Sequence, residues 1–383
     1  MRLYYEWGIK QLNKYYEELC GDSVAISRLS NSVTLALSDG LGSGVKANIL
    51  AMLTTRIAIH MLENDLALDE VVQTLSETLP ICKVRNLAYS TFAIAQFLSQ
   101  GSARVVEFDS PNVILLRQRK IQPLVYEERC IKGKTIRESL LDLEVGDWII
   151  FVSDGVLNAG IGGIYPLGWG WDQLAHFLEK HAHPDLSAQD LADKVAKTVS
   201  ELYENSPGDD VSVVVIKVRR KMVATVLTGP PADRSEDEAL VSQFLRCAGR
   251  IVVCGGTTAK IVSHYLGKPL EVDLKTMTPD VPAIAHIEGI NLVTEGIITL
   301  TQVNGILRSG ARKEDIRFRT DGAAELVRLF LDVDHVKFLV GRAVNPAHQN
   351  PELPRQLEIR MLVVREIGEE LRKRGKEVTI ESV

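Results

Sequence analysis

An aspartate at the edge of an apolar run occurs three times in the first 215 residues of this chain. Asp39 follows the run TLAL, Asp154 follows IIFV, and Asp209 precedes SVVVIKV, while a fourth acid, Asp22, lies in CGDSVAI. Each run has the β-branched, apolar character of a buried strand, which places the acids at strand ends. A lone Asp-Gly is usually a turn. Several carboxylates at one sheet edge would instead repel one another, and divalent cations held between them would remove that repulsion.

The composition excludes several classes of protein. The chain has 383 residues, 45% of them hydrophobic, which is enough to fill more than one core. A net charge of -6 argues against a nucleic-acid partner. The five cysteines show no CxxC spacing and lie mostly among apolar residues, so we expect reduced thiols and a cytoplasmic protein. No run approaches the roughly 18 apolar residues of a membrane span, so no membrane partner is expected.

The first part of the chain predicts helices packed on antiparallel strands. Helical periodicity extends over 45–65, with Met52 expected in the core, and a second helix ends at Pro80. The strand-like runs around Phe92, Val106 and Ile114 predict an antiparallel meander. After a strand over 148–152, two more helices are expected before the strand that follows Asp210.

A change of pattern near Lys221 predicts a domain boundary. The segment TGPPADRSEDEA interrupts the apolar pattern with proline and charge, and a new β-α-β pattern follows it. We therefore expect two domains, residues 1–220 and 221–383. The second is predicted to be a smaller α/β domain that binds a ligand, docks a partner or forms a homodimer.

Three motifs in the first domain together resemble a known family. In order, SDGLGSGVKA, FVSDGVLNA and GDDVSVVVIKV resemble the SpoIIE-type serine phosphatases, the bacterial branch of the PP2C metal-dependent phosphatases. The resemblance covers roughly residues 18–219. It implies an α+β fold, namely an α-β-β-α sandwich of two antiparallel sheets with a two-metal centre at one end.

The resemblance also implies a reaction and its residues. Carried over position by position, the resemblance implies two bound Mn²⁺ or Mg²⁺ ions. Their implied ligands are four acids and one backbone carbonyl group, namely Asp22, Asp39, Asp154, Asp209 and the carbonyl of Gly40. The catalytic acids among them would be Asp39, Asp154 and Asp209, and the neighbouring Asp210 would orient the site. The implied reaction is hydrolysis of phosphoserine or phosphothreonine by a metal-activated water. The implied substrate is a phosphorylated protein, in this family often an anti-sigma-factor antagonist.

A second interpretation stays open at this stage. The sandwich could be a catalytically weak scaffold, a pseudophosphatase, whose C-terminal domain binds a nucleotide or another anionic ligand. A degenerate site is expected to lose at least one acid, and all four mapped carboxylates are present. The residues therefore favour an enzyme, and the resemblance implies a role in bacterial regulatory signalling.

The second domain contains one candidate anion site. In RIVVCGGTTAK a strand leads into Gly255 and Gly256, and then into Thr257 and Thr258 at a helix start. Free backbone amides at such a start can bind phosphate. The segment lacks both the P-loop lysine and the GxGxxG spacing, so a simple capped turn is the competing interpretation. The three histidines of HFLEKHAH are expected on the helix surface and not around a metal.

Overall fold

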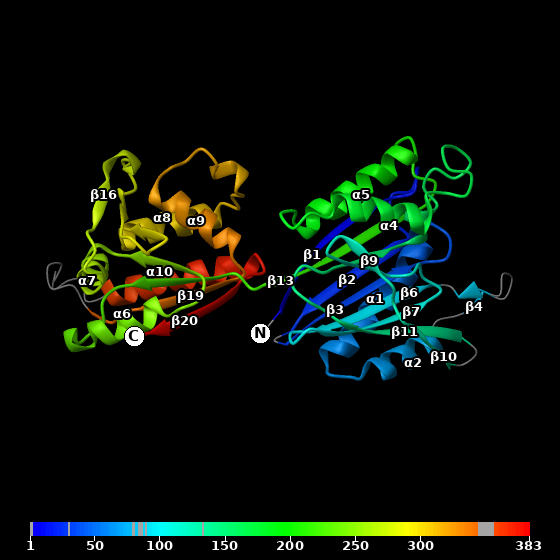
Figure 1. Ribbon diagram of the computed structural model, residues 1–383, viewed down its shortest axis with the longest axis horizontal. Helices are drawn as coiled ribbons and strands as arrows, with labels where there is room; N and C mark the ends of the chain where they lie inside the picture. Colours follow the sequence, from blue (N-terminus) through cyan, green and yellow to red (C-terminus); the bar gives the residue numbers. More distant parts are fainter. Residues whose placement is uncertain are drawn as a thin grey trace. The chain divides into compact units, whose positions relative to one another are not determined.

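The computed structural model describes residues 3–29, 31–78, 81–82, 87–88, 90–131, 134–343 and 356–383. The chain folds as two compact units, Met1–Arg220 and Lys221–Val383 (Figure 1).

The first unit contains two antiparallel sheets. The five-stranded sheet has the order β1 (Leu3–Leu12), β13 (Val211–Arg220), β12 (Trp148–Val152), β8 (Ile114–Arg117) and β9 (Lys120–Gln122). The six-stranded sheet has the order β10 (Glu127–Ile131), β11 (Lys134–Asp142), β7 (Ser102–Phe108), β6 (Phe92–Leu98), β3 (Ser32–Asp39) and β2 (Asp22–Arg28). Two short strands, β4 (Ile81–Cys82) and β5 (Leu87–Ala88), pair with each other.

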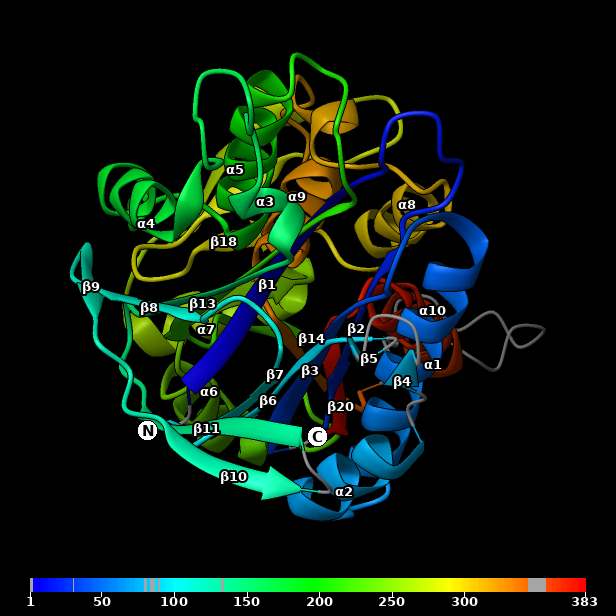
Figure 2. The same cartoon turned by 90° about the vertical axis from the view of Figure 1, so that its right-hand side faces the viewer.

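Helices cover the outer face of each sheet. The helices α1 (Gly44–Glu63) and α2 (Leu68–Thr78) pack on the six-stranded sheet, and α4 (Gly170–His181) and α5 (Ala188–Leu202) pack on the five-stranded sheet (Figure 2). The single-turn helix α3 (Asp154–Leu157) begins two residues after β12. The predicted α-β-β-α sandwich is therefore confirmed.

Alternation along the strands explains why they are apolar on both faces. In β3, Leu35 and Leu37 point into the core between the sheets, whereas Ala36 packs under the helices α1 and α2. In β13, Val214 faces the same inter-sheet core and Val213 faces α5. Strands buried on both faces carry apolar residues at every position, without the polar alternation of a half-exposed strand.

The predicted meander is only partly right. The strands β6 and β7 pair as neighbours, but β8 leaves them and pairs with β12 in the other sheet. The apolar pattern of β8 is the same in either sheet, so the sequence does not reveal where the chain crosses between them.

The helix α1 is apolar on both its buried and its exposed side. Its length and hydropathy of 1.2 would suffice for a membrane span by those two criteria. Its buried side carries Ala47, Ala51 and Ala58 and packs against β2 and β3, and 39% of the apolar window is buried inside the folded unit. The expectation that Met52 is core is wrong, because 43% of this side chain is exposed together with Ile49 on the outer side of the helix.

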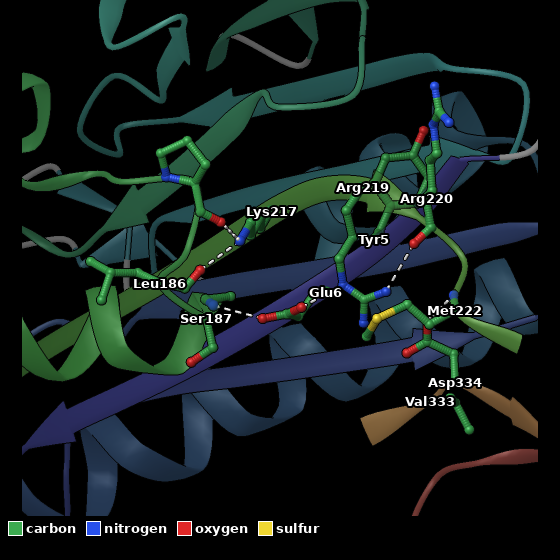
Figure 3. Close-up of polar contacts among 12 residues, drawn as sticks. Tyr5, Glu6, Leu186, Ser187, Lys217, Arg219, Arg220, Met222, Val333 and Asp334 are labelled. Atoms are coloured by element: carbon green, nitrogen blue, oxygen red, sulfur yellow. Dashed lines mark hydrogen bonds and ion pairs between the residues drawn. The ribbon is translucent and has the colours of Figure 1, made fainter. Parts of the chain in front are cut away.

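Charged side chains of β1 and β13 hold the start of α5 (Figure 3). Lys217 donates from Nζ to the carbonyl oxygen of Leu186 at 2.6 Å. Arg219 donates from Nε to Glu6 Oε2 at 2.5 Å, and the other oxygen of Glu6 accepts a hydrogen bond from the amide of Ala188 at 2.8 Å. These contacts fix the first turn of α5 across β1.

The second unit is an α/β domain built on one seven-stranded sheet. Its order is β16 (Glu271–Asp273), β17 (Ile284–His286), β18 (Leu292–Thr294), β15 (Arg250–Cys254), β14 (Val223–Thr228), β19 (His335–Val340) and β20 (Glu377–Ser382). The five strands from β18 to β20 are parallel, and β16 and β17 are antiparallel. The helices α6 (Asp237–Leu245) and α7 (Gly256–Leu266) pack on one face, and α8 (Ile297–Arg308), α9 (Gly322–Asp332) and α10 (Gln356–Lys373) pack on the other.

Candidate metal centre

The acids predicted from the strand ends come together at one end of the sandwich. Asp22 and Asp39 are opposite each other in the β2–β3 ladder. Asp154 is the first residue of α3, after β12, and Asp209 lies two residues before β13. Asp39 interacts electrostatically with Asp22, Asp154, Asp209 and Asp210. The six-stranded sheet thus supplies two of these acids and the five-stranded sheet supplies the others.

The acids differ in their burial. Asp22 and Asp210 are each only 3% exposed, and in each of them the oxygen Oδ2 has no hydrogen-bond partner within the described residues. Asp39, Asp154 and Asp209 are half-buried. Buried carboxylate oxygens without partners destabilise the folded state. A purely structural role therefore does not explain these two oxygens.

Burial and mutual repulsion raise the pKa values of these groups. Burial raises the pKa of Asp39 to about 9, and the neighbouring charges of Asp22 and Asp154 add to that increase. Burial also raises the pKa of Asp22 to about 7, against the lowering effect of hydrogen bonds from two serine hydroxyls. The pKa values of Asp154 and Asp209 are raised too, again chiefly by burial. The cluster therefore favours either protons or cations among its carboxyl groups.

Glycines let the backbone segments of the site approach closely. A Cβ atom on Gly155 would lie 2.0 Å from the carbonyl oxygen of Asp210, so α3 and the start of β13 can meet only at a glycine. A Cβ atom on Gly40 would lie 2.2 Å from the carbonyl oxygen of Ala47 in α1. Gly40 was predicted from its carbonyl group as a metal ligand. The structure gives the residue a further role, the close approach of α1 to the end of β3.

Several polar residues around the acids were not predicted from the sequence. Gln11 donates from Nε2 to Ser212 Oγ at 2.8 Å, and the amide of Lys14 donates to Asp210 Oδ1 at 3.0 Å. The hydroxyl of Tyr203 donates to the carbonyl oxygen of Gly155 at 2.8 Å. Gln11 and Lys14 lie about 200 residues from β13 in the sequence, and no local motif marks them.

The donor chemistry of the cluster fits hard divalent cations. All candidate ligands are oxygens, which suit Mg²⁺ and Mn²⁺, and two of the buried oxygens lack a partner. Within the described ranges, no three His, Cys, Asp or Glu side chains are already arranged around one metal position. Magnesium usually binds through one or two carboxylates and keeps several waters, so the two observations are compatible. The histidines of α4, His176 and His181, belong to no such group within the described ranges.

The candidate anion site of the second unit lies at the start of α7. Gly255 precedes the helix with φ of 135°, a conformation open to glycine, and Gly256 is its first residue. Of these two glycines only Gly255 has a positive φ. Thr257 is exposed and Thr258 is buried.

Comparison with known proteins supports the reading of the first unit. Residues 30–219 match the sequence model of the family Stage II sporulation protein E (SpoIIE). None of the curated proteins matches the chain significantly.

Three solved structures resemble part of the chain. The phosphatase domain of the cell-fate determinant SpoIIE from Bacillus subtilis, without domain swapping, is 19% identical, with a TM-score of 0.45 over 57% of this chain and 94% of that chain. The PP2C phosphatase domain of the same protein with a fragment of its regulatory domain is 18% identical, with a TM-score of 0.48 over 57% and 64%. RsbX in complex with magnesium is 17% identical, with a TM-score of 0.41 over 56% and 95%.

The family match, the order of the three motifs and the layered sandwich agree with one another. Residues 30–219 of this chain therefore form a domain of the SpoIIE family, with the fold of the PP2C-type phosphatases.

Proposed function

We propose that this protein is a metal-dependent phosphatase that hydrolyses phosphoserine and phosphothreonine in other proteins. The observation that carries the proposal is the convergence of aspartates from both sheets at one end of the sandwich, with raised pKa values and two buried oxygens without partners. A cluster of this kind costs folding free energy, and a bound cation would offset that cost.

Five groups are proposed to hold two Mn²⁺ or Mg²⁺ ions: Asp22, Asp39, the carbonyl group of Gly40, Asp154 and Asp209. When bound, such a pair of ions lowers the pKa of water and stabilises charge on a phosphoryl group. Asp39, Asp154 and Asp209 are also the proposed catalytic acids, because they are half-buried and accessible from outside.

The surrounding residues are proposed to position these acids. The hydrogen bond from Lys14 N fixes one oxygen of Asp210, and the amide of Asp210 donates in turn to Asp209 Oδ1 at 3.0 Å. Tyr203 and Gly155 hold the backbone that carries Asp154 against the start of β13. Backbone amides thus hold Asp209 and Asp210, and the side chain of Tyr203 holds the backbone next to Asp154.

A protein substrate is proposed because the accessible acids lie at an end of the sandwich and can be reached by a side chain on another molecule. We further propose that the protein acts in bacterial regulatory signalling in the cytoplasm. A phosphorylated anti-sigma-factor antagonist is the substrate that the family resemblance suggests.

Hydrolysis assays on the full chain test this function. The protein is incubated with p-nitrophenyl phosphate and with a phosphoserine peptide, in Mn²⁺, in Mg²⁺ and in EDTA. We expect turnover of both substrates with metal and none in EDTA. Turnover that is unchanged in EDTA, or no turnover of either substrate with any metal, would contradict the proposal.

A further inference from the structure

The strand order of the second unit changes direction between β14 and β19. From β14 the chain moves outward to β15 and β18, and it then returns to β19 and β20 on the opposite side of β14. In open parallel sheets, ligands bind outside the carboxyl ends of the strands at such a reversal. Here these ends are followed by Gly229 after β14 and by Gly341 after β19.

A guanidinium group lies at this reversal. Arg360, in α10, donates from Nη1 to the carbonyl oxygen of Gly341 at 3.1 Å. A Cβ atom on Gly229 would lie 2.1 Å from the same Nη1, and a Cβ atom on Gly341 would lie 2.2 Å from the carbonyl oxygen of Gly229. Gly229 thus leaves the space that the arginine occupies, and Gly341 lets the two backbone segments approach each other. Burial lowers the pKa of Arg360, and the charge of Glu295 opposes this effect.

Two buried hydroxyl groups near this edge have no partner. Thr228, the last residue of β14, is 1% exposed, and Thr299, in the first turn of α8, is fully buried; neither Oγ1 has a hydrogen-bond partner among the described residues. In β14, Ala224 and Val226 pack toward α8, α9 and α10. By alternation Thr228 points to that same side, at the carboxyl edge.

The helices α8 and α10 run side by side in the same direction. Asn304 Nδ2 donates to Glu366 Oε2 at 2.5 Å, and near the ends of both helices Arg374, the residue after α10, donates from Nη2 to the carbonyl oxygen of Leu307 at 2.6 Å. The first turn of α8, with Thr299, is therefore beside the first turns of α10. The unpaired hydroxyls and the guanidinium group belong to the same end of the sheet.

The start of α7 borders the same edge. Gly255 follows Cys254, the ladder partner of Thr228, and no side chain within the described residues caps this helix. A Cβ atom on Gly256 would meet nothing within 4 Å, so the space in front of the helix is open. At α8, by contrast, Glu295 Oε2 accepts the hydrogen bond from the amide of Ile298 at 3.1 Å. Of these two helix starts, α7 is the one with amides available to an anion.

We propose that the carboxyl edge between β14 and β19 binds a phosphorylated small molecule, and that the positively charged Arg360 is the main contact to its phosphate group. The hydroxyl group of Thr228 and the amides of Gly256 and Thr257 would supply further donors. A guanidinium group and free amides together suit the several oxygens of a phosphate group. This inference is independent of phosphatase activity, because every residue in it belongs to the second unit.

Isothermal titration calorimetry on the full chain tests the proposal. The Asp154→Asn variant in EDTA is titrated with inorganic phosphate, ribose 5-phosphate, AMP and ADP, so that hydrolysis in the first unit does not interfere. We expect at least one probe to bind. Arg360→Gln is expected to weaken that binding tenfold or more, since a charge-assisted contact is lost. Thr228→Val is expected to weaken it severalfold without lowering the stability of the ligand-free protein, because the removed hydroxyl has no partner.

The matched control is Arg374→Gln, which removes an arginine that follows the last residue of α10, away from the proposed site. It is expected to leave the affinity unchanged. The absence of binding by all four probes at millimolar concentration would overturn the proposal. The proposal would also be overturned if Arg360→Gln and Thr228→Val both bound the probe as tightly as the protein without these substitutions, because the probe would then bind elsewhere. Because no arm of this experiment measures turnover, its failure is distinguishable from a failure of the phosphatase assay.

Discussion

Asp22 and Asp39 are direct partners in the antiparallel ladder of β2 and β3, so two carboxyl groups share one cross-strand position. Like charges directly opposite each other destabilise a sheet. The pair is stable in two ways, through protons on the carboxyl groups or through a cation between them. This relationship makes the first unit sensitive to pH when metal is absent.

We predict that the metal-free first unit loses stability as the pH rises. Asp22 and Asp39 have pKa values of about 7 and about 9 in the folded protein, above their ordinary value of 3.8. The folded state therefore binds more protons than the unfolded state between pH about 4 and about 9, and this contribution to stability is present at low pH and lost through that window. All four tryptophans lie before residue 221, so tryptophan fluorescence in EDTA follows the melting temperature of this unit.

Two additions sharpen this measurement. Mn²⁺ is expected to remove most of the decline above pH 7, and Asp39→Asn is expected to flatten it without metal. The exposed Asp193 serves as the control, because Asp193→Asn leaves the cluster intact. A melting temperature that rises steadily from pH 5 to pH 9 in EDTA would show that these acids are not protonated in the folded state.

Asp154→Asn is predicted to lose nearly all phosphatase activity and to keep the fold. The substitution removes one proposed metal ligand and at the same time one charge from a repelling group, so the metal-free protein should melt at the same temperature or slightly higher. Loss of a ligand costs at least about 10- to 100-fold in activity or affinity. Asp172→Asn, in the first turn of α4, is the control. Retention of more than about a tenth of wild-type turnover at saturating Mn²⁺ would remove Asp154 from the site.

Gly155→Ala is predicted to destabilise the first unit by about 1 to 3 kcal/mol and to lower activity. The added methyl group would lie 2.0 Å from the carbonyl oxygen of Asp210, so α3 and the start of β13 must separate. Gly163→Ala is the matched control, since its nearest neighbour would be 3.5 Å away. Urea unfolding followed by tryptophan fluorescence measures both variants. Equal free energies of unfolding would mean that the contact at residue 155 relaxes freely.

Tyr203→Phe is predicted to weaken metal activation more than it weakens the fold. The variant loses one hydrogen bond to the carbonyl oxygen of Gly155, worth about 1 kcal/mol. Because Asp154 is the preceding residue, the Mn²⁺ concentration for half-maximal activity should rise about tenfold or more. Tyr5→Phe removes a comparable hydrogen bond, to the carbonyl oxygen of Leu98, away from the acids. If both variants shift the metal requirement equally, Tyr203 has no specific role there.

The sequence predicted the elements of this fold better than their connections. The strand 148–152 and the helix over 45–65 were confirmed to within two residues, because strong periodicity and clear breaks define them. The crossing of β8 into the other sheet was missed, since its apolar pattern is satisfied in either sheet.

The residues of the candidate site also divide into those that a local sequence pattern marks and those that only the fold brings together. The acids were found because each one interrupts an apolar run, which is a local signal. Gln11, Lys14 and Tyr203 carry no such signal, because they reach the acids only after chain segments about 200 residues apart, or from the end of a different helix, have come together. An anion site in the second unit was predicted at Gly255, and it stays a prediction. Arg360 was not part of that prediction, because only the strand order brings it to the same edge.

The pairing of β1 with β13 joins Leu3 to Arg220 and Leu12 to Val211. During synthesis, the first strand must therefore wait for some 200 further residues before its partner emerges from the ribosome. Contacts between such distant segments form slowly, and an unpaired strand edge can meanwhile associate with other chains. The first unit should fold late and all at once when residue 220 becomes available, and Gln11 and Lys14 would reach the acids only in that final step.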